Sequence, residues 1–385
     1  MSYHRVLAAL TLAVSLIGCA PGNPKFPWRF GAPGPDARPA PAPAMRPFLM
    51  GFTPWPADLS EAGFRAAQEF AHAHGDIVSI MFIGGVPWPE ALEGKPFSKA
   101  IQENLSYRPP AGKKLFLSIS PLDKDRRGLA PYWADQDSLP LPKPWDKERL
   151  DSPRVKKAFL NFVLRSVQSM QPNYLAIGVE SNVLLSREPA KWAQLKELHR
   201  ETYAAVKKAH PALPVFFTTE VLHYKKLAKN SKGTDQEREV ANLMKHSDLF
   251  AMSVYPHMSA ELARPIPASF FDFASRFKKP IAVSESGMTS RNVPLRSYGV
   301  TLQGSDGEQQ YFTELLLKTA ARDNYQFVIN FATTDFEKLV ARLRPPLNEI
   351  AGIWAFTGMQ TSGEKPKPAL AIWDAYLRAK LVRGG

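Results

Sequence analysis

Short apolar runs recur along the chain from Pro47 onward, and longer stretches with helical spacing separate them. The runs are PFLMGFT, DIVSIMFI, KKLFLSIS, NYLAIGVE, PVFFTTE, DLFAMSVY, PIAVSES and QFVINFA. Most of them lack strict alternation of apolar and polar residues, which is typical of parallel strands buried on both faces. We therefore predict eight parallel strands that alternate with helices.

Two of the intervening stretches carry the clearest helical pattern. In residues 152–172, five apolar side chains fall on one stripe: Phe159, Phe162, Val163, Val167 and Met170. Ser152 before Pro153 is a plausible start signal for this helix. Residues 191–211 repeat the helical pattern, and Pro211 ends it.

Eight strands that alternate with helices over roughly 330 residues predict an α/β fold, the (β/α)8 or TIM barrel with loop insertions. An open doubly wound sheet is the alternative. It is disfavoured because no glycine-rich phosphate loop follows the first predicted strand. The barrel would span residues 47–385 as a single domain.

Two of the predicted strands end in a glutamate, Glu180 on the fourth and Glu285 on the seventh. The carboxyl ends of barrel strands form one mouth, where the active sites of this fold lie, so both side chains should face the same pocket. Paired carboxylates across a cleft are what the cleavage of a glycosidic bond requires. One carboxyl group donates a proton to the leaving oxygen, and the other attacks the anomeric carbon or activates water.

Four segments resemble the clan A glycoside hydrolases: IGVESN, SVYPHM, IAVSESG and GMQTSGEKPKPALAIW. Distant similarity to glycoside hydrolase families 53 and 113 is the nearest we can name. The resemblance implies that Glu180 is the general acid/base and Glu285 the nucleophile of a retaining glycosidase. It also implies that Tyr255 hydrogen-bonds the nucleophile.

One position departs from the clan pattern. Most clan members have an Asn directly before the acid/base, where it binds the sugar 2-hydroxyl, whereas this chain has Val179 there and Asn182 two residues beyond Glu180. This departure keeps open a different class of function, a surface glycan-binding lipoprotein with a degenerate barrel and little or no turnover. The two facing carboxylates favour the enzyme.

Asn182 and several other residues near the predicted mouth are candidates for substrate binding. Trp55, Trp88 and Trp354 could stack on a sugar ring. Glu220 ends the fifth strand, and three roles are open for it: substrate binding, pairing with a Lys or Arg, or the true acid if the strand count is off by one. His257 could bind a hydroxyl or be structural, and Asp335 could bind substrate or cap a loop.

No cofactor is implied by the sequence. His72 and His74 form a His-x-His pair, but they precede the second strand and lack a third ligand, so a zinc site is unsupported. The formal charge of +13 raises the question of nucleic acid. The basic residues are scattered over predicted helix faces without a nucleic-acid motif, so we expect no nucleic-acid partner, and attraction to acidic polysaccharide or to anionic surface lipid would explain the charge equally well. The glycosidase resemblance implies a polysaccharide or oligosaccharide partner.

The first residues predict that the protein is located in the cell envelope. A short basic start and a brief apolar run lead to Leu16-Ile17-Gly18-Cys19, which resembles the lipobox of bacterial lipoproteins. We expect a signal peptide over 1–18, acylation of Cys19 and a Pro/Ala-rich tether over 19–46. An ordinary cleaved signal peptide is the alternative. By the same resemblance, Ala20 after the cysteine favours retention at the outer membrane of a Gram-negative cell, facing the periplasm or the surface. We expect the protein to be a monomer.

Overall fold

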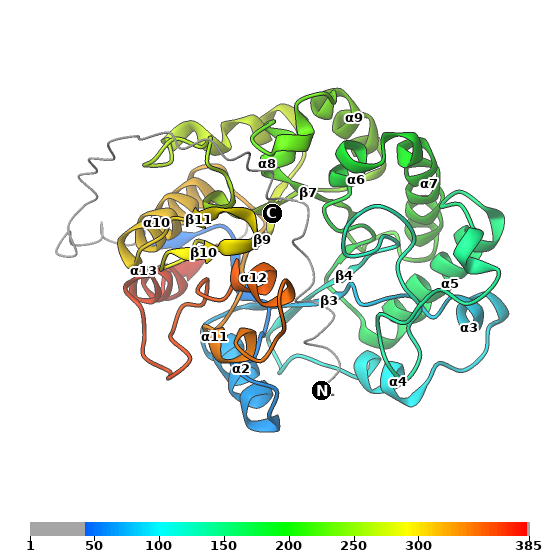
Figure 1. Ribbon diagram of the computed structural model, residues 1–385, viewed down its shortest axis with the longest axis horizontal. Helices are drawn as coiled ribbons and strands as arrows, with labels where there is room; N and C mark the ends of the chain where they lie inside the picture. Colours follow the sequence, from blue (N-terminus) through cyan, green and yellow to red (C-terminus); the bar gives the residue numbers. More distant parts are fainter. Residues whose placement is uncertain (1–42, 383–385) are drawn as a thin grey trace.

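A ring of parallel strands occupies the centre of the protein, whose computed structural model describes residues 43–382 (Figure 1). The strands are β2 (Leu49–Phe52), β3 (Ile77–Phe82), β4 (Lys114–Ile119), β5 (Tyr174–Ala176), β6 (Val215–Phe216), β7 (Thr218–Glu220), β8 (Phe250–Val254), β9 (Ile281–Ser286) and β12 (Phe327–Asn330). Their order in the sheet is β6-β5-β4-β3-β2-β12-β9-β8-β7. All eight predicted apolar runs form strands of this sheet.

The fifth barrel strand is split at Phe217 into β6 and β7. β6 pairs with β5, and β7 pairs with β8. Because these two pieces are consecutive in the chain and stand at opposite ends of the strand order, they close the sheet into a barrel. The predicted (β/α)8 fold is therefore confirmed.

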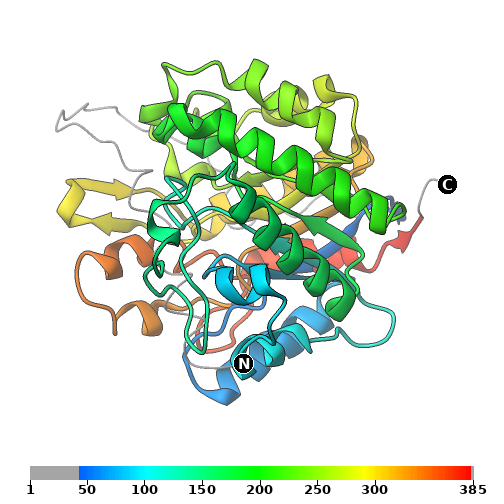
Figure 2. The same ribbon diagram turned by 90° about the vertical axis from the view of Figure 1, so that its right-hand side faces the viewer.

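Helices surround the barrel on its outer side (Figure 2). They are α2 (Glu61–Ala73), α3 (Trp88–Glu93), α4 (Lys99–Leu105), α5 (Pro153–Met170), α6 (Asn182–Arg187), α7 (Trp192–Ala209), α8 (Val221–Tyr224), α9 (Gln236–Leu243), α10 (Asp306–Arg322), α11 (Glu337–Val340), α12 (Leu347–Gly352) and α13 (Pro368–Leu377), with the 3₁₀ helix η6 (Ala268–Phe277). Ser152 begins α5 as predicted, because its hydroxyl accepts a hydrogen bond from the Val155 N–H at 3.3 Å. The five residues of the predicted stripe on α5 are all buried.

Both faces of the sheet are buried, which explains the unbroken apolar runs. Inside the barrel, one cluster is built from side chains of the strands and includes Leu49, Ile77, Phe116, Phe216 and Phe327. Outside the sheet, a larger cluster joins alternate strand residues to the helices. Burial of apolar area on two faces is the main source of stability for such strands.

The first two strands approach each other closely at Gly51. A Cβ atom at this position would lie 1.8 Å from the carbonyl oxygen of Ile77 on β3. Only glycine fits between the strands at this distance.

The two ends of the described chain meet at the end of the barrel opposite the mouth. β1 (Met45–Arg46) pairs in parallel with β13 (Lys380–Leu381). Arg46 is 2% exposed and forms an ion pair with Asp76 at 2.7 Å. The ordered fold thus takes in Met45 and Arg46, which the sequence analysis assigns to the tether. The predicted signal peptide, Cys19 and the rest of the tether up to residue 42 lie outside the described residues.

A hairpin insertion projects beside the barrel between β9 and α10, and the sequence analysis did not predict it. Its strands β10 (Val293–Leu295) and β11 (Val300–Leu302) pair antiparallel, and they lie next to α10 in Figure 1. Within residues 43–382, no helix is long and apolar enough to cross a membrane.

Candidate active site at the barrel mouth

Glu180 lies in the loop that follows β5, at the carboxyl end of the fourth barrel strand. Its backbone adopts the left-handed region, with φ of 49°. Its N–H donates to the Thr218 hydroxyl at 2.7 Å, and the next N–H, of Ser181, donates to the Thr218 carbonyl at 3.0 Å. The residue is only 8% exposed. A left-handed non-glycine backbone that is held by its neighbours is typical of a functional position.

Glu285 lies near the end of β9, on the seventh barrel strand. A register shift between Met252 and Ser253 of the neighbouring β8 accompanies it. The Tyr255 hydroxyl, at the end of β8, donates a hydrogen bond to Oε1 of Glu285. Tyr255 is 3% exposed, and the Trp354 ring packs edge-on against it with 5.9 Å between ring centroids. The predicted contact between Tyr255 and Glu285 is therefore present.

The two carboxyl groups interact electrostatically. Burial, and next the charge of Glu180, raise the pKa of Glu285 to about 8, although the Tyr255 hydrogen bond and the charge of Arg126 act to lower it. Burial likewise raises the pKa of Glu180, and the guanidinium of Arg126 opposes this shift. Perturbed carboxyl groups that feel each other's charge in one buried region are candidates for acid and base roles.

Arg126 is the site residue that the sequence analysis missed. It lies in the loop after β4, is 1% exposed, and its Nη2 donates to Oε2 of Glu180 at 3.3 Å. Its segment, LDKDRRGLA, reads as an ordinary charged loop. The only signal available was the position of this loop after the third strand, at the mouth.

Two of the three candidate tryptophans lie close to the site. Trp354 contacts Tyr255, and Trp55 packs against Phe331 and Phe336 in the same apolar cluster. The indole N–H of Trp55 is buried and has no hydrogen-bond partner among residues 43–382. These two rings remain candidates for sugar binding.

Trp88 does not offer a stacking face. It is fully buried, its indole N–H donates to the Ala130 carbonyl at 2.9 Å, and its ring stacks on Trp145 at 5.5 Å. The chain turns into α3 at this residue, so the side chain packs into the core beside the barrel instead of pointing into the mouth.

Asn182 is also engaged within the protein and is 0% exposed. Its Nδ2 donates to the Glu220 carbonyl and to Gln236 Oε1, both at 3.0 Å, and its Oδ1 accepts from the Glu220 N–H at 2.7 Å. The side chain therefore joins α6 to β7 and has no group left for a sugar hydroxyl.

Glu220 caps α8 instead of pointing freely into the mouth. Its carboxylate accepts hydrogen bonds from the N–H groups of Leu222 and His223 and from the His223 ring at 2.7 Å. Its charge nevertheless raises the pKa of Glu180, so it contributes to the electrostatics of the site.

His257 and Asp335 are both held by structural contacts. The His257 ring contacts the Ile353 carbonyl at 3.1 Å, and burial lowers its pKa to about 3, so the imidazole is neutral. Asp335 pairs with Lys367 at 2.6 Å, with both side chains almost fully buried, and burial raises the pKa of Asp335 to about 6. For Asp335 the structure favours the loop-capping alternative, since it also accepts from the Gly358 N–H.

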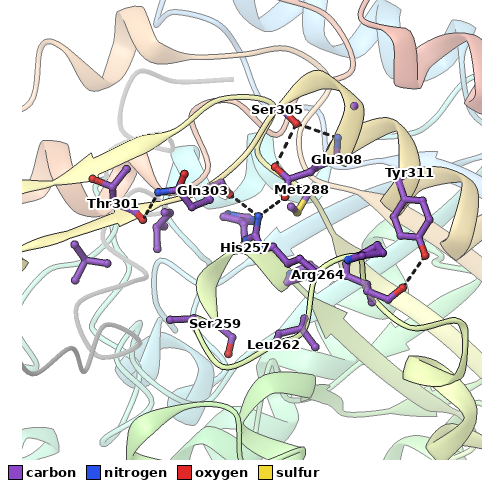
Figure 3. A pocket seen from close by; sticks show the side chains of 17 residues that line it. His257, Ser259, Leu262, Arg264, Met288, Thr301, Gln303, Ser305, Glu308 and Tyr311 are labelled. Atoms are coloured by element: carbon purple, nitrogen blue, oxygen red, sulfur yellow. Dashed lines mark hydrogen bonds and ion pairs between the residues drawn. The ribbon is translucent and has the colours of Figure 1, made fainter. Parts of the chain in front are cut away.

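A cavity of about 410 Å³ lies beside these residues, under the hairpin β10–β11 (Figure 3). Its wall includes His257, Leu262, Met288 and Tyr311. Arg264 also lines the cavity, and its guanidinium donates to the Gln303 carbonyl and to the Glu308 carboxylate. Neither Glu180 nor Glu285 lines it, so this cavity is separate from the two carboxyl groups.

Potential metal ligands are not grouped in the described part of the chain, where no cluster of three or more His, Cys, Asp or Glu side chains could hold an ion. His74 pairs instead with Asp374 at 2.7 Å, and His72 contacts the Tyr107 hydroxyl.

Comparison with known proteins points to one group of enzymes. The sequence model of glycosyl hydrolase family 53 matches residues 130–321, a segment that contains both glutamates and Tyr255. No curated protein matches the chain.

Solved structures of glycosidases share the fold. An exo-beta-1,4-mannosidase, Op5Man5 from Opitutaceae bacterium strain TAV5, superposes with a TM-score of 0.58 and 15% identity over 89% of this chain and 61% of that one. GH5_18 from Streptomyces cattleya, in complex with GlcNAc, superposes with a TM-score of 0.57 and 15% identity over 87% of this chain and 80% of that one. Beta-glucuronidase 2 of Bacteroides uniformis superposes with a TM-score of 0.52 and 12% identity over 86% of this chain and 35% of that one. The predicted resemblance to clan A glycoside hydrolases is confirmed at the level of the barrel.

Proposed function

Since the chain has the (β/α)8 barrel of the clan A glycoside hydrolases, we propose that it is a retaining glycosidase that cleaves a β-linked glycan. Glu180 is the general acid/base and Glu285 the nucleophile. The observation that carries the proposal is the convergence of both carboxyl groups with Tyr255 at the carboxyl ends of three barrel strands.

In the first step, the carboxylate of Glu285 attacks the anomeric carbon of the bound sugar. The glycosidic C–O bond breaks, and Glu180 donates its proton to the leaving oxygen. The hydrogen bond from Tyr255 supports this assignment, because it stabilises the charged form of Glu285 and fixes the attacking oxygen atoms.

In the second step, Glu180 acts as a base. It takes a proton from a water molecule, the water oxygen bonds to the anomeric carbon, and the ester to Glu285 breaks. The enzyme returns to its starting state with one proton on Glu180, and the sugar is released with its original anomeric configuration.

The cycle needs the single proton of this pair on Glu180, and the hydrogen bond from Tyr255 favours that placement because it stabilises the Glu285 anion. Two buried carboxyl groups that repel each other's charge tend to hold one proton between them near neutral pH. The resting enzyme then has one acid and one anion, which is the state that the first step needs.

The cell location is part of the same proposal. The lipobox-like sequence at Cys19 supports a lipid-anchored protein of the cell envelope. If the anchor is at Cys19, the Cys19→Ser variant should move from the membrane fraction to the soluble fraction. No cofactor is needed for the two steps above, and the substrate is a polysaccharide or oligosaccharide.

A glycan-binding protein with little turnover is the second candidate, and Val179 is the observation that favours it. Its side chain is apolar and 2% exposed, so it cannot supply the sugar 2-hydroxyl contact that the clan's Asn makes. Hydrogen bonds to this hydroxyl strengthen in the transition state and contribute several kcal/mol in such enzymes.

Hydrolysis of a panel of aryl β-glycosides and β-linked polysaccharides tests the proposal. We expect turnover by the wild-type protein, its loss in Glu285→Gln, and a reduction of about 10²- to 10⁴-fold in Glu180→Gln for poor leaving groups. Glu188→Gln is the matched control, because Glu188 lies a few residues from Glu180 but pairs with Arg127 near the surface.

The anomer that appears first in the proton NMR spectrum gives the stereochemistry. Retention supports a glycosyl-enzyme on Glu285, and inversion contradicts it. Absence of turnover on every substrate, with glycan binding unchanged in both glutamate variants, would favour the binding protein.

A further inference from the structure

Arg126 is buried at the mouth in an unusual backbone conformation. It is 1% exposed, and its φ of 53° lies in the left-handed region. Its N–H donates to the Asp123 carbonyl at 3.0 Å, which holds the loop after β4 in a tight turn. A large charged residue is rarely buried unless it is paired, so this position needs an explanation.

The guanidinium group is fixed on every nitrogen. Nε donates to the Val179 carbonyl at 2.8 Å, and Nη1 donates to the carbonyls of Asp123 and Lys124 at 3.1 and 3.0 Å. Nη2 donates to Oε2 of Glu180 at 3.3 Å. One rigid, planar group thus connects the loop of the third barrel strand to the carboxylate on the fourth.

The peptide unit before Glu180 is held from both sides. Its carbonyl, that of Val179, accepts from Arg126, and its N–H, that of Glu180, donates to the Thr218 hydroxyl at 2.7 Å. Because both ends of this peptide are bonded, the backbone of Glu180 is kept in its left-handed conformation. The carboxylate then meets the same guanidinium that holds its own main chain.

We propose that Arg126 is a positioning residue for Glu180, which fixes the direction of its carboxyl group and stabilises the anion that forms when Glu180 donates its proton in the first step. This inference rests on the proposed function. The polar contact to the Glu180 carboxyl group comes from Arg126, since the preceding Val179 side chain offers no polar group.

Several other charged or titratable groups act on Glu180 from the elements packed around it: Arg187 at the end of α6, Glu220 and His223 at β7 and α8, Tyr255 after β8, and Glu285 on β9. Arg126 is the cation in direct contact with the carboxylate. Its charge lowers the pKa of Glu180 and of Glu285, so its removal should raise both pKa values.

The test compares Arg126→Met and Arg126→Lys, with Arg127→Met as the matched control. Arg127 is the next residue, but its guanidinium pairs with Glu188 near the surface. We would measure kcat/KM against pH on two aryl glycosides of the same sugar, one with a poor leaving group and one with dinitrophenolate, which needs no proton.

We expect Arg126→Met to lower kcat/KM by about 10- to 100-fold on the poor leaving group and only slightly on the activated one. Its pH profile should move to higher pH. Arg126→Lys should keep the pH profile, since it keeps the charge, but lose part of the rate, since an ammonium cannot make the same four contacts. Arg127→Met should match the wild type.

A folded Arg126→Met with unchanged rate and profile would overturn the role of Arg126 and leave the glycosidase proposal intact. If Arg126→Met does not fold, Arg126→Lys decides: an equal loss on both substrates overturns positioning, and a loss confined to the poor leaving group supports it. If the wild type has no turnover, the proposed function fails. The pKa of Glu180, followed by carbon-13 NMR, then tests Arg126 directly, and no increase in Arg126→Met overturns the inference.

Discussion

At the scale of single residues, the site is defined by the protonation of two carboxyl groups. Glu180 and Glu285 are both under one-tenth exposed, and burial disfavours the charged form of each. Tyr255 and Arg126 each stabilise one anion through a specific contact. The two carboxyl groups therefore differ in their partners, which allows one to carry the proton while the other reacts.

Removal of the Tyr255 hydroxyl should change the pH dependence of catalysis. The hydrogen bond lowers the pKa of Glu285, so Tyr255→Phe should raise that pKa above its value of about 8. Because kcat/KM requires the ionised nucleophile, the acidic limb of its pH profile should move to higher pH. Tyr311→Phe is a suitable control, since its hydroxyl contacts the Ile266 carbonyl elsewhere. An acidic limb that stays in place would show that Tyr255 does not act on the nucleophile.

Asn182 allows structural and substrate-binding roles to be told apart. Asn182→Ala should lower the free energy of unfolding by about 1–3 kcal/mol, because it leaves buried groups of Glu220 and Gln236 without their partner. Urea unfolding measures this loss, and KM should change little. The opposite result, a raised KM with unchanged stability, would mean that Asn182 binds sugar.

The sequence analysis predicted two glutamates at the barrel mouth and the contact of Tyr255 with Glu285, but not the other neighbours of these carboxyl groups. Glu180 and Glu285 each end an apolar run, and the barrel rule brings strand ends together. The engagement of Asn182 and the capping role of Glu220 depend on which loops meet, and no pattern along the chain records that. Arg126 was missed for the same reason, since its partner is 54 residues away in the sequence.

At the scale of elements, the spacing of apolar residues predicted the main helices and strands. The helix α5 and all eight strand positions follow from spacing, because burial of a stripe or of two faces imposes it. The hairpin β10–β11 is short, with a burial pattern that includes exposed residues, so no apolar run marks it. The split of the fifth strand at Phe217 is likewise invisible, since β6 and β7 form one apolar run in the sequence.

The cap of α5 gives a prediction at this scale. Ser152 accepts from the Val155 N–H, and Ser152→Ala should lower the free energy of unfolding by about 1 kcal/mol. Ser152→Gly should cost only a few tenths of that, since glycine is a tolerated cap. Denaturant unfolding of both variants checks the order. Equal stability of Ser152→Ala and wild type would show that solvent satisfies this helix end.

At the scale of the whole molecule, the Arg46 side chain joins the two ends of the described chain. Arg46 pairs with Asp76 and also donates to the carbonyls of Phe48 and Leu377. It thereby connects β1 and the first two barrel strands to the last helix, α13.

Breaking this pair should destabilise the entire barrel. Arg46→Met leaves the partly buried Asp76 charge and the carbonyls of Phe48 and Leu377 with fewer partners, and we expect a loss of about 1–3 kcal/mol in the free energy of unfolding. Arg276→Met, which removes a surface pair with Glu237, should cost less than about 1 kcal/mol. Thermal and urea unfolding check both variants. A small effect of Arg46→Met would mean that water satisfies the remaining carboxylate.

The parallel pairing of β1 with β13 also determines how the protein could be oriented on a surface. Both strands lie at the amino ends of the barrel strands, and the two glutamates lie at the carboxyl ends. A support attached upstream of β1, whether an acyl chain in a bilayer or a resin in a column, would hold the molecule by its base. The barrel mouth, with the two glutamates, would then face away from the support and toward polymers in solution.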